Sequence, residues 1–181
     1  MHQYPFYLGG SFIPNLVDKS KALPPGYKWS DQVQYKGIVG IPYCPSTMSI
    51  FEFYSQCMPM FFPSVDLMLR MKKDYTAYVL AESSWNQTWN IKSGSIIRPG
   101  PNDPNDFENL DKFRNWLPKA DFYDTEWMPY IQYFDDWNEF RDRLANIKNE
   151  TLIEISNSMA SFNSVRLQRV NRLWEGVMAR I

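Results

Sequence analysis

The stretch from Tyr35 to Ser64 constrains the fold most, because it holds two apolar runs separated by a helical segment. The runs cover residues 37–43 and 58–62, and the residues between them, 46–57, follow a helical pattern. Uninterrupted apolar strands on both sides of a helix are typical of a parallel βαβ unit that is buried on both faces. The pattern therefore predicts an α/β fold with this unit at its centre.

The start of that helix is the part of the stretch best suited to bind an anion. Ser46, Thr47 and Ser49 supply hydroxyl groups there, and Ser49 lies three residues before Glu52, the spacing of a capping box. The unpaired N–H groups of a helix N-terminus and the helix dipole together attract negative charge. We expect a phosphate group to fit this position.

Glu52 is the one charged residue in the mostly apolar segment 48–54. Its carboxylate lies about one turn inside the helix, and its two acceptor oxygens match the paired hydroxyls of a ribose. A Glu that only stabilises its own helix through the dipole explains the same residue. Both interpretations of Glu52 stay open on the sequence alone.

Taken together, these features resemble the donor-binding half of GT-B glycosyltransferases. The matching features are the first strand, a Pro-Ser turn, a helix that bears Glu52, and a returning strand of the form Pro59-x-Phe61-x-Pro63-Ser64. The resemblance implies that the helix N-terminus faces the diphosphate of a nucleotide sugar and that Glu52 binds the ribose hydroxyls. It is strong over Tyr35–Ser64 and weaker towards the C-terminus.

The same resemblance assigns the donor-binding residues. Many members carry a second Glu, eight residues before the first, that contacts the sugar; here Cys44 stands at that position. The helix N-terminus takes the role that a divalent cation plays elsewhere, so the resemblance implies no metal and no cofactor besides the donor. The residues implied to contact the donor are Glu52, Ser49, Thr47, Ser46, Met48, Tyr43 and Cys44.

Composition excludes several classes of partner. A net charge of −1 gives no electrostatic reason to bind nucleic acid or an anionic membrane, and no apolar run is long enough to span a bilayer. The N-terminus lacks a signal sequence, so we expect a cytoplasmic chain or a cytosolic-type fragment of a longer one.

Cys44 and Cys57 lie at opposite ends of a helix roughly 16 Å long, too far apart for a disulfide. We expect two free thiols, and the single His2 makes a zinc site unfavourable.

The rest of the chain extends the α/β pattern into one domain, residues 1–181, with residues 36–64 as its core. Ser64 is placed to cap a helix that reaches about residue 74, and Asp106 or Asn109 starts another that ends near residue 117. A strand at 130–134 precedes a helix over 137–147 that Asp135 or Asp136 caps. Residues 83–105 are predicted to form a long loop. We expect a Rossmann-like parallel sheet of four to six strands, flanked by helices, with the ligand outside its carboxyl ends.

The C-terminal segment, 149–181, has apolar residues at steps of mostly three and four, which predicts helices. Several Ser and Asn residues weaken its middle, so we expect a break near Ala160–Ser164. Four arginines give the second half a basic face, which a solvated surface explains more simply than a binding patch. Exposed apolar residues near Leu173-Trp174 would fit a missing partner.

The predicted function is that of a glycosyltransferase donor domain that binds a nucleotide diphosphate sugar. It is a fragment or one half of an enzyme, because the acceptor-binding domain would lie elsewhere in the same chain or in another; no catalytic residue is identified. One alternative is a non-catalytic protein-interaction module. A third is a different phosphate-ligand enzyme on a flavodoxin-like sheet, with acid–base candidates Asp121, Asp124, Asp135 and Asp136.

Overall fold

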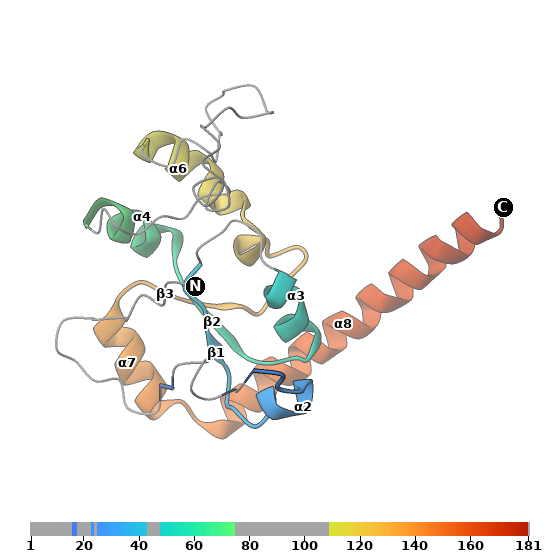
Figure 1. The fold of residues 1–181 in the computed structure, drawn as a ribbon, viewed down its shortest axis with the longest axis horizontal. Helices are drawn as coiled ribbons and strands as arrows, with labels where there is room; N and C mark the ends of the chain where they lie inside the picture. Colours follow the sequence, from blue (N-terminus) through green and yellow to red (C-terminus); the bar gives the residue numbers. More distant parts are fainter. Residues whose placement is uncertain (1–15, 18–22, 24, 43–47, 75–108, 181) are drawn as a thin grey trace.

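The computed structural model describes residues 16–17, 23, 25–42, 48–74 and 109–180, and this part of the chain is mixed α/β (Figure 1). A parallel sheet lies among helices, and a long C-terminal helix leaves the body. In chain order the elements are α2 (Trp29–Gln32), β1 (Ile38–Val39), α3 (Met48–Ser55), β2 (Met60–Pro63), α4 (Val65–Asp74), α6 (Leu110–Trp116), the 3-10 helices η1 (Leu117–Lys119) and η2 (Asp121–Tyr123), β3 (Gln132–Phe134), α7 (Trp137–Asn146) and α8 (Asn149–Met178).

The sheet has the order β1-β2-β3, and both pairs of neighbours are parallel. Ile38 pairs with Met60 in the first ladder and Phe62 with Tyr133 in the second. The predicted parallel βαβ unit is therefore confirmed as β1-α3-β2. Three strands lie in the described ranges, where we expected four to six in the whole chain.

The central strand β2 is buried along its whole length. Adjacent residues of a strand point to opposite faces, and the contacts of β2 follow this rule. The ring of Phe61 lies 5.8 Å from that of Phe140 in α7, whereas Phe62 stacks on Phe122 of η2 at 5.7 Å. On the Phe62 side, burial raises the pKa of Tyr133 to about 12, and its hydroxyl donates to the carbonyl oxygen of Phe122. Both faces of the sheet are thus covered.

Three of the predicted helix starts are confirmed. The Oγ atom of Ser64 accepts a hydrogen bond from the backbone N–H of Leu67 at 3.1 Å, at the start of α4. The side chain of Asn109 caps α6, and that of Asp136 caps α7. Such polar caps satisfy backbone donors that have no partner inside the helix.

The predicted break in the C-terminal segment is wrong, because α8 runs without interruption from Asn149 to Met178. Its polar residues bond within the helix or to the body instead of ending it. The hydroxyl of Ser161 donates to the carbonyl oxygen of Asn157 at 2.9 Å, and Asn163 donates to the carbonyl oxygen of Tyr54 at 3.0 Å. None of the helices in the described ranges is long and apolar enough to cross a membrane.

The turn between α3 and β2 contains a residue in a strained conformation. Cys57 is a free thiol with a φ of 57°, in the left-handed region that favours glycine. The backbone N–H of the next residue, Met58, donates to the carbonyl oxygen of Phe53, the bond that closes a helix in a Schellman motif. The turn therefore holds Cys57 in a left-handed conformation at a position where glycine is the usual residue.

Substituting this residue therefore tests the strain. We expect Cys57→Gly to raise the free energy of unfolding by about 1 kcal/mol over Cys57→Ala, because only glycine adopts this φ without a steric cost. Both variants lose the weak contact between Sγ of Cys57 and Nδ2 of Asn163, so their comparison isolates the backbone. Urea unfolding measures the difference; equal stability of the two variants would contradict the strain.

Candidate functional site

The carboxyl edge of the sheet is where helices begin. Helix α4 starts two residues after the end of β2, α7 starts three residues after the end of β3, and α3 ends shortly before β2 begins. Because the strands are parallel, α3 runs back along the sheet and its N-terminus lies towards this same edge (Figure 1). Three helix N-termini, each with a partial positive charge, are thus directed to one edge.

Two of these helix N-termini already have protein caps. The Oγ atom of Ser64 accepts from one first-turn amide of α4, that of Leu67, and the carboxylate of Asp136 accepts from the N–H groups of Asn138 and Glu139 at 2.8 and 3.1 Å. The residue before α3 lies outside the described residues. Of the three helices that begin at this edge, α3 is therefore the one whose N-terminal amides have no capping residue assigned in the described part of the chain.

The predicted donor-binding residues that are described lie on α3. Met48, its first residue, is 76% exposed, and Glu52 is exposed one turn later on the same side. Ser49 is half-buried beside them, and the opposite side of α3 is buried in the core. The remaining predicted site residues, Tyr43, Cys44, Ser46 and Thr47, lie outside the described residues, as does the long loop predicted at 83–105.

The predicted capping box between Ser49 and Glu52 is wrong. Helix α3 already includes Met48, so Ser49 lies within the first turn and is not the N-cap. No described residue bonds to the carboxylate of Glu52; the bonds at this position involve its backbone carbonyl, which accepts from Ser55 and Gln56. In the described part of the chain, the Glu52 carboxylate therefore has no hydrogen-bond partner.

The buried side of α3 is held by Tyr54. Its hydroxyl donates to the carbonyl oxygen of Pro129 at 2.5 Å, and its ring meets Phe162 of α8 edge-to-face at 6.3 Å. Burial raises the pKa of Tyr54 well above its ordinary value, while the Arg166 guanidinium 5.8 Å from the ring opposes this shift. The hydroxyl stays protonated and acts as a structural donor, so Glu52 stands on a rigidly mounted helix.

Two of the four carboxylates considered for acid–base chemistry have structural roles. Asp124 accepts hydrogen bonds from the N–H groups of Glu126 and Trp127, which closes a turn. Asp136 caps α7, and the hydrogen bonds from Glu139 and Asn138 lower its pKa. These contacts favour the simpler explanation of both residues, a turn and a helix cap.

The cap predicts a specific pH dependence. Because the folded state lowers the pKa of Asp136, its carboxylate stabilises the fold above the unfolded pKa of about 3.9, and this stability is lost as the pH falls through the folded pKa. We expect Asp136→Asn to have a lower Tm than the wild type at pH 7, with the two converging in acid. Asp136→Ala loses the cap itself and stays below Asp136→Asn at both pH values. A wild-type advantage over Asp136→Asn that persists unchanged in strong acid would contradict this.

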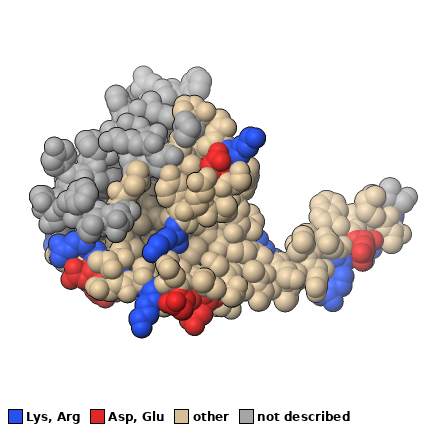
Figure 2. Space-filling model, turned by 90° about the horizontal axis from the view of Figure 1, so that it is seen from below, with Lys and Arg blue, Asp and Glu red and all other residues tan. Residues whose placement is uncertain are grey.

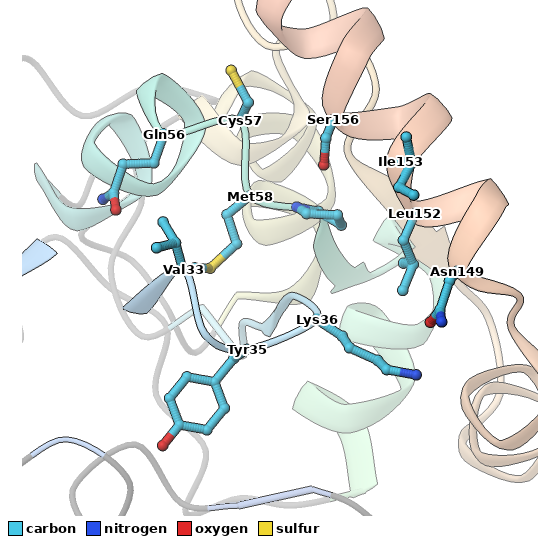
Figure 3. Close-up of a pocket in the computed structure, with 11 residues that line it drawn as sticks. Val33, Tyr35, Lys36, Gln56, Cys57, Met58, Asn149, Leu152, Ile153 and Ser156 are labelled. Carbon is cyan, nitrogen blue, oxygen red and sulfur yellow. The ribbon is translucent and has the colours of Figure 1, made fainter. Parts of the chain in front are cut away.

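A cavity of about 450 Å³ lies at the opposite, amino edge of the sheet (Figure 3). The segment before β1, the end of α3 and the first turns of α8 line it, and Lys36 extends across it towards Asn149. The lining combines this lysine and amide groups with apolar side chains, and its described residues include no carboxylate. No sequence pattern indicated this cavity, because its α8 wall begins ninety residues after Pro59, the last lining residue of the other walls.

Neither a search for metal-ligand clusters nor a comparison with known proteins identifies a function for this chain. No three His, Cys, Asp or Glu side chains of the described ranges come together as metal ligands, so metal independence stays a prediction. Comparisons with protein-family models, with curated proteins and with solved structures found no match to this chain.

Proposed function

We propose that the chain is the nucleotide-sugar-binding half of a GT-B-type glycosyltransferase, built on a Rossmann-like sheet. In this proposal the donor diphosphate lies at the start of α3 against residues 46–49, and Glu52 holds the ribose hydroxyls. Tyr43 and Cys44 face the sugar. The observation that carries the proposal is the parallel β1-α3-β2 unit, which directs the start of α3 to the carboxyl edge with Glu52 exposed one turn away.

The energetics of this site suit a diphosphate. Each hydrogen bond from an amide or hydroxyl to a charged oxygen contributes about 1.5–3 kcal/mol, and the helix dipole adds about 0.3–1 kcal/mol at an exposed terminus. Two or three such bonds give an affinity in the micromolar to millimolar range after the cost of association. A carboxylate on the same exposed side of α3 adds two acceptors for the vicinal hydroxyls of a ribose.

The exposure of this side of α3 fits one half of a two-part site. Met48 and Glu52 face away from the core, and a donor bound there would stay open to water until an acceptor-binding domain covered it. In the proposal that domain belongs to the same gene product or to another chain. It would also supply the catalytic base.

Titration calorimetry of the chain against UDP, GDP, ADP and a UDP-sugar tests the proposal. We expect one nucleotide diphosphate to bind with a Kd below about 1 mM, and Glu52→Gln to weaken it by about tenfold, or about 1.4 kcal/mol. The loss follows because the neutral amide keeps a single acceptor oxygen for the two ribose hydroxyls.

Glu154→Gln is the matched control, since it removes an exposed carboxylate from α8, and it should leave the affinity unchanged. Circular dichroism verifies that each variant is folded. A folded chain that binds none of the four ligands, or binds one equally well after Glu52→Gln, would exclude the proposed donor site.

A second candidate function, a protein-interaction module, is favoured by a different observation. The distal half of α8 exposes a row of large apolar side chains that the described body does not cover. In that function Glu52 only stabilises its helix, and the calorimetry above distinguishes the two.

A further inference from the structure

The distal part of α8 and the two residues after it, together residues 167–180, form an arm that projects from the body (Figures 1 and 2). Its apolar side chains are exposed to an extent unusual for a packed helix: Leu173 is 63% exposed, Trp174 62% and Val177 48%. Much of the arm surface in Figure 2 is uncharged. A contiguous exposed apolar face of this kind marks an interaction surface.

The arm continues the face by which α8 packs on its own body. Leu152, Ile155 and Met159 belong to or pack against the hydrophobic core. Val170, Leu173 and Val177 each stand eighteen positions after one of these residues, which is about five full helical turns. The apolar face of the arm therefore points to the same side of α8 as the body.

This geometry creates a concave corner between the arm and the body. At the root of the arm, Arg166 donates to the carbonyl oxygen of Trp127 at 3.4 Å, and the Arg169 guanidinium lies 5.9 Å from the Trp127 ring. Trp127 is itself 45% exposed, so it extends the apolar surface from the arm onto the body. A flat membrane does not fit a corner of this shape, because the body would obstruct it. A protein of convex or elongated shape would fit this corner.

Charge identifies which protein fits. The arm carries Arg169, Arg172 and Arg180 against Glu175, a net charge of +2. The body segment that ends at Trp127 carries three acids within residues 121–126, Asp121, Asp124 and Glu126, a net charge of −3. The chain thus holds both a basic apolar arm and an acidic surface beside the root of that arm.

We propose that the corner is occupied by the arm of a second copy of this chain. The two arms cross antiparallel about a two-fold axis near Leu173. Val170 then faces the partner's Val177, and Leu173 faces the partner's Trp174. In this register residue 180 lies opposite residue 167 of the other copy, which brings Arg180 towards the partner's Glu126.

The symmetry and size of such an interface agree with those of specific dimers. The contact is isologous, because each copy gives an arm and receives one. Specific interfaces bury about 1,200–2,000 Å² in total, so both arms and both acidic corners must contribute to the contact. The inference does not depend on nucleotide binding at α3.

Analytical ultracentrifugation of the chain over a range of concentrations tests the dimer. We expect a dimer at micromolar concentrations, and Val177→Asp to raise its dissociation constant at least 100-fold, because it places a charge in the apolar contact opposite the partner's Val170. Val165→Asp is the matched control: Val165 is 64% exposed on the same helix, but lies about 120° around the axis from Val177. This control should leave the dissociation constant unchanged.

Charge reversal tests the antiparallel register. Arg180→Glu alone and Glu126→Lys alone should each weaken the dimer by about tenfold, and the double variant should restore it, because the pair is reversed across the interface. High salt should weaken the wild-type dimer.

Three results would overturn the proposal. One is a chain that stays monomeric at about 100 μM, where an interface of this size would associate. Another is a dimer that Val177→Asp and Val165→Asp weaken equally. The last is a dimer in which the double charge variant gives no recovery over the single variants. Because both valines are exposed, circular dichroism should show that the fold survives either substitution.

Discussion

The burial of β2 on both faces is the constraint on which the rest of the structure depends. Phe61 packs against α7 on one face, Phe62 stacks on η2 on the other, and the Tyr123 hydroxyl donates to the carbonyl oxygen of Pro63 at the strand end. A strand buried this completely needs neighbours on both edges, and β1 approaches so closely that a Cβ at Gly37 would lie 2.6 Å from the Pro59 carbonyl oxygen. The position of α3, and with it Glu52, follows from this packing.

The sequence was informative where a local signal and the hydrophobic pattern agreed. Ser64 directly follows the buried strand β2, and Asp136 stands two residues after β3, so the starts of α4 and α7 were predictable. The exact start of α3 was not, because Ser49 has the right spacing for a capping box but the helix begins one residue before it. Residue spacing alone does not fix a helix boundary that tertiary packing decides.

The long helix shows a second limit of sequence patterns. Ser and Asn residues near Ala160 predicted a break, yet Ser161 bonds back to the helix and Asn163 bonds to α3, so tertiary contacts outweighed helix propensity. The cavity at the amino edge also had no sequence signal, since distant segments build it. In contrast, the exposure of Leu173 and Trp174 agrees with the sequence expectation, because the apolar spacing of α8 continues past the last residues that reach the core.

The proposed donor site and the arm of α8 share a structural support. Tyr54 fixes α3 through Pro129, and the root of the arm contacts the same tyrosine through Phe162, Asn163 and Arg166. These contacts with Tyr54 therefore help to fix the position of α3, the helix that carries Glu52. A partner seated beside the arm would lie near the helix that carries the proposed ligand site.

Hydrogen exchange of the chain with and without a mixture of UDP, GDP and ADP tests the location of the ligand site most directly. We expect slower exchange of backbone amides in the first turns of α3, residues 48–52, because their N–H groups bond to the diphosphate and the bound ligand stabilises the helix. Protection confined to the amino edge, around Lys36, Cys57 and Asn149, would place the ligand in the cavity there and would contradict the account.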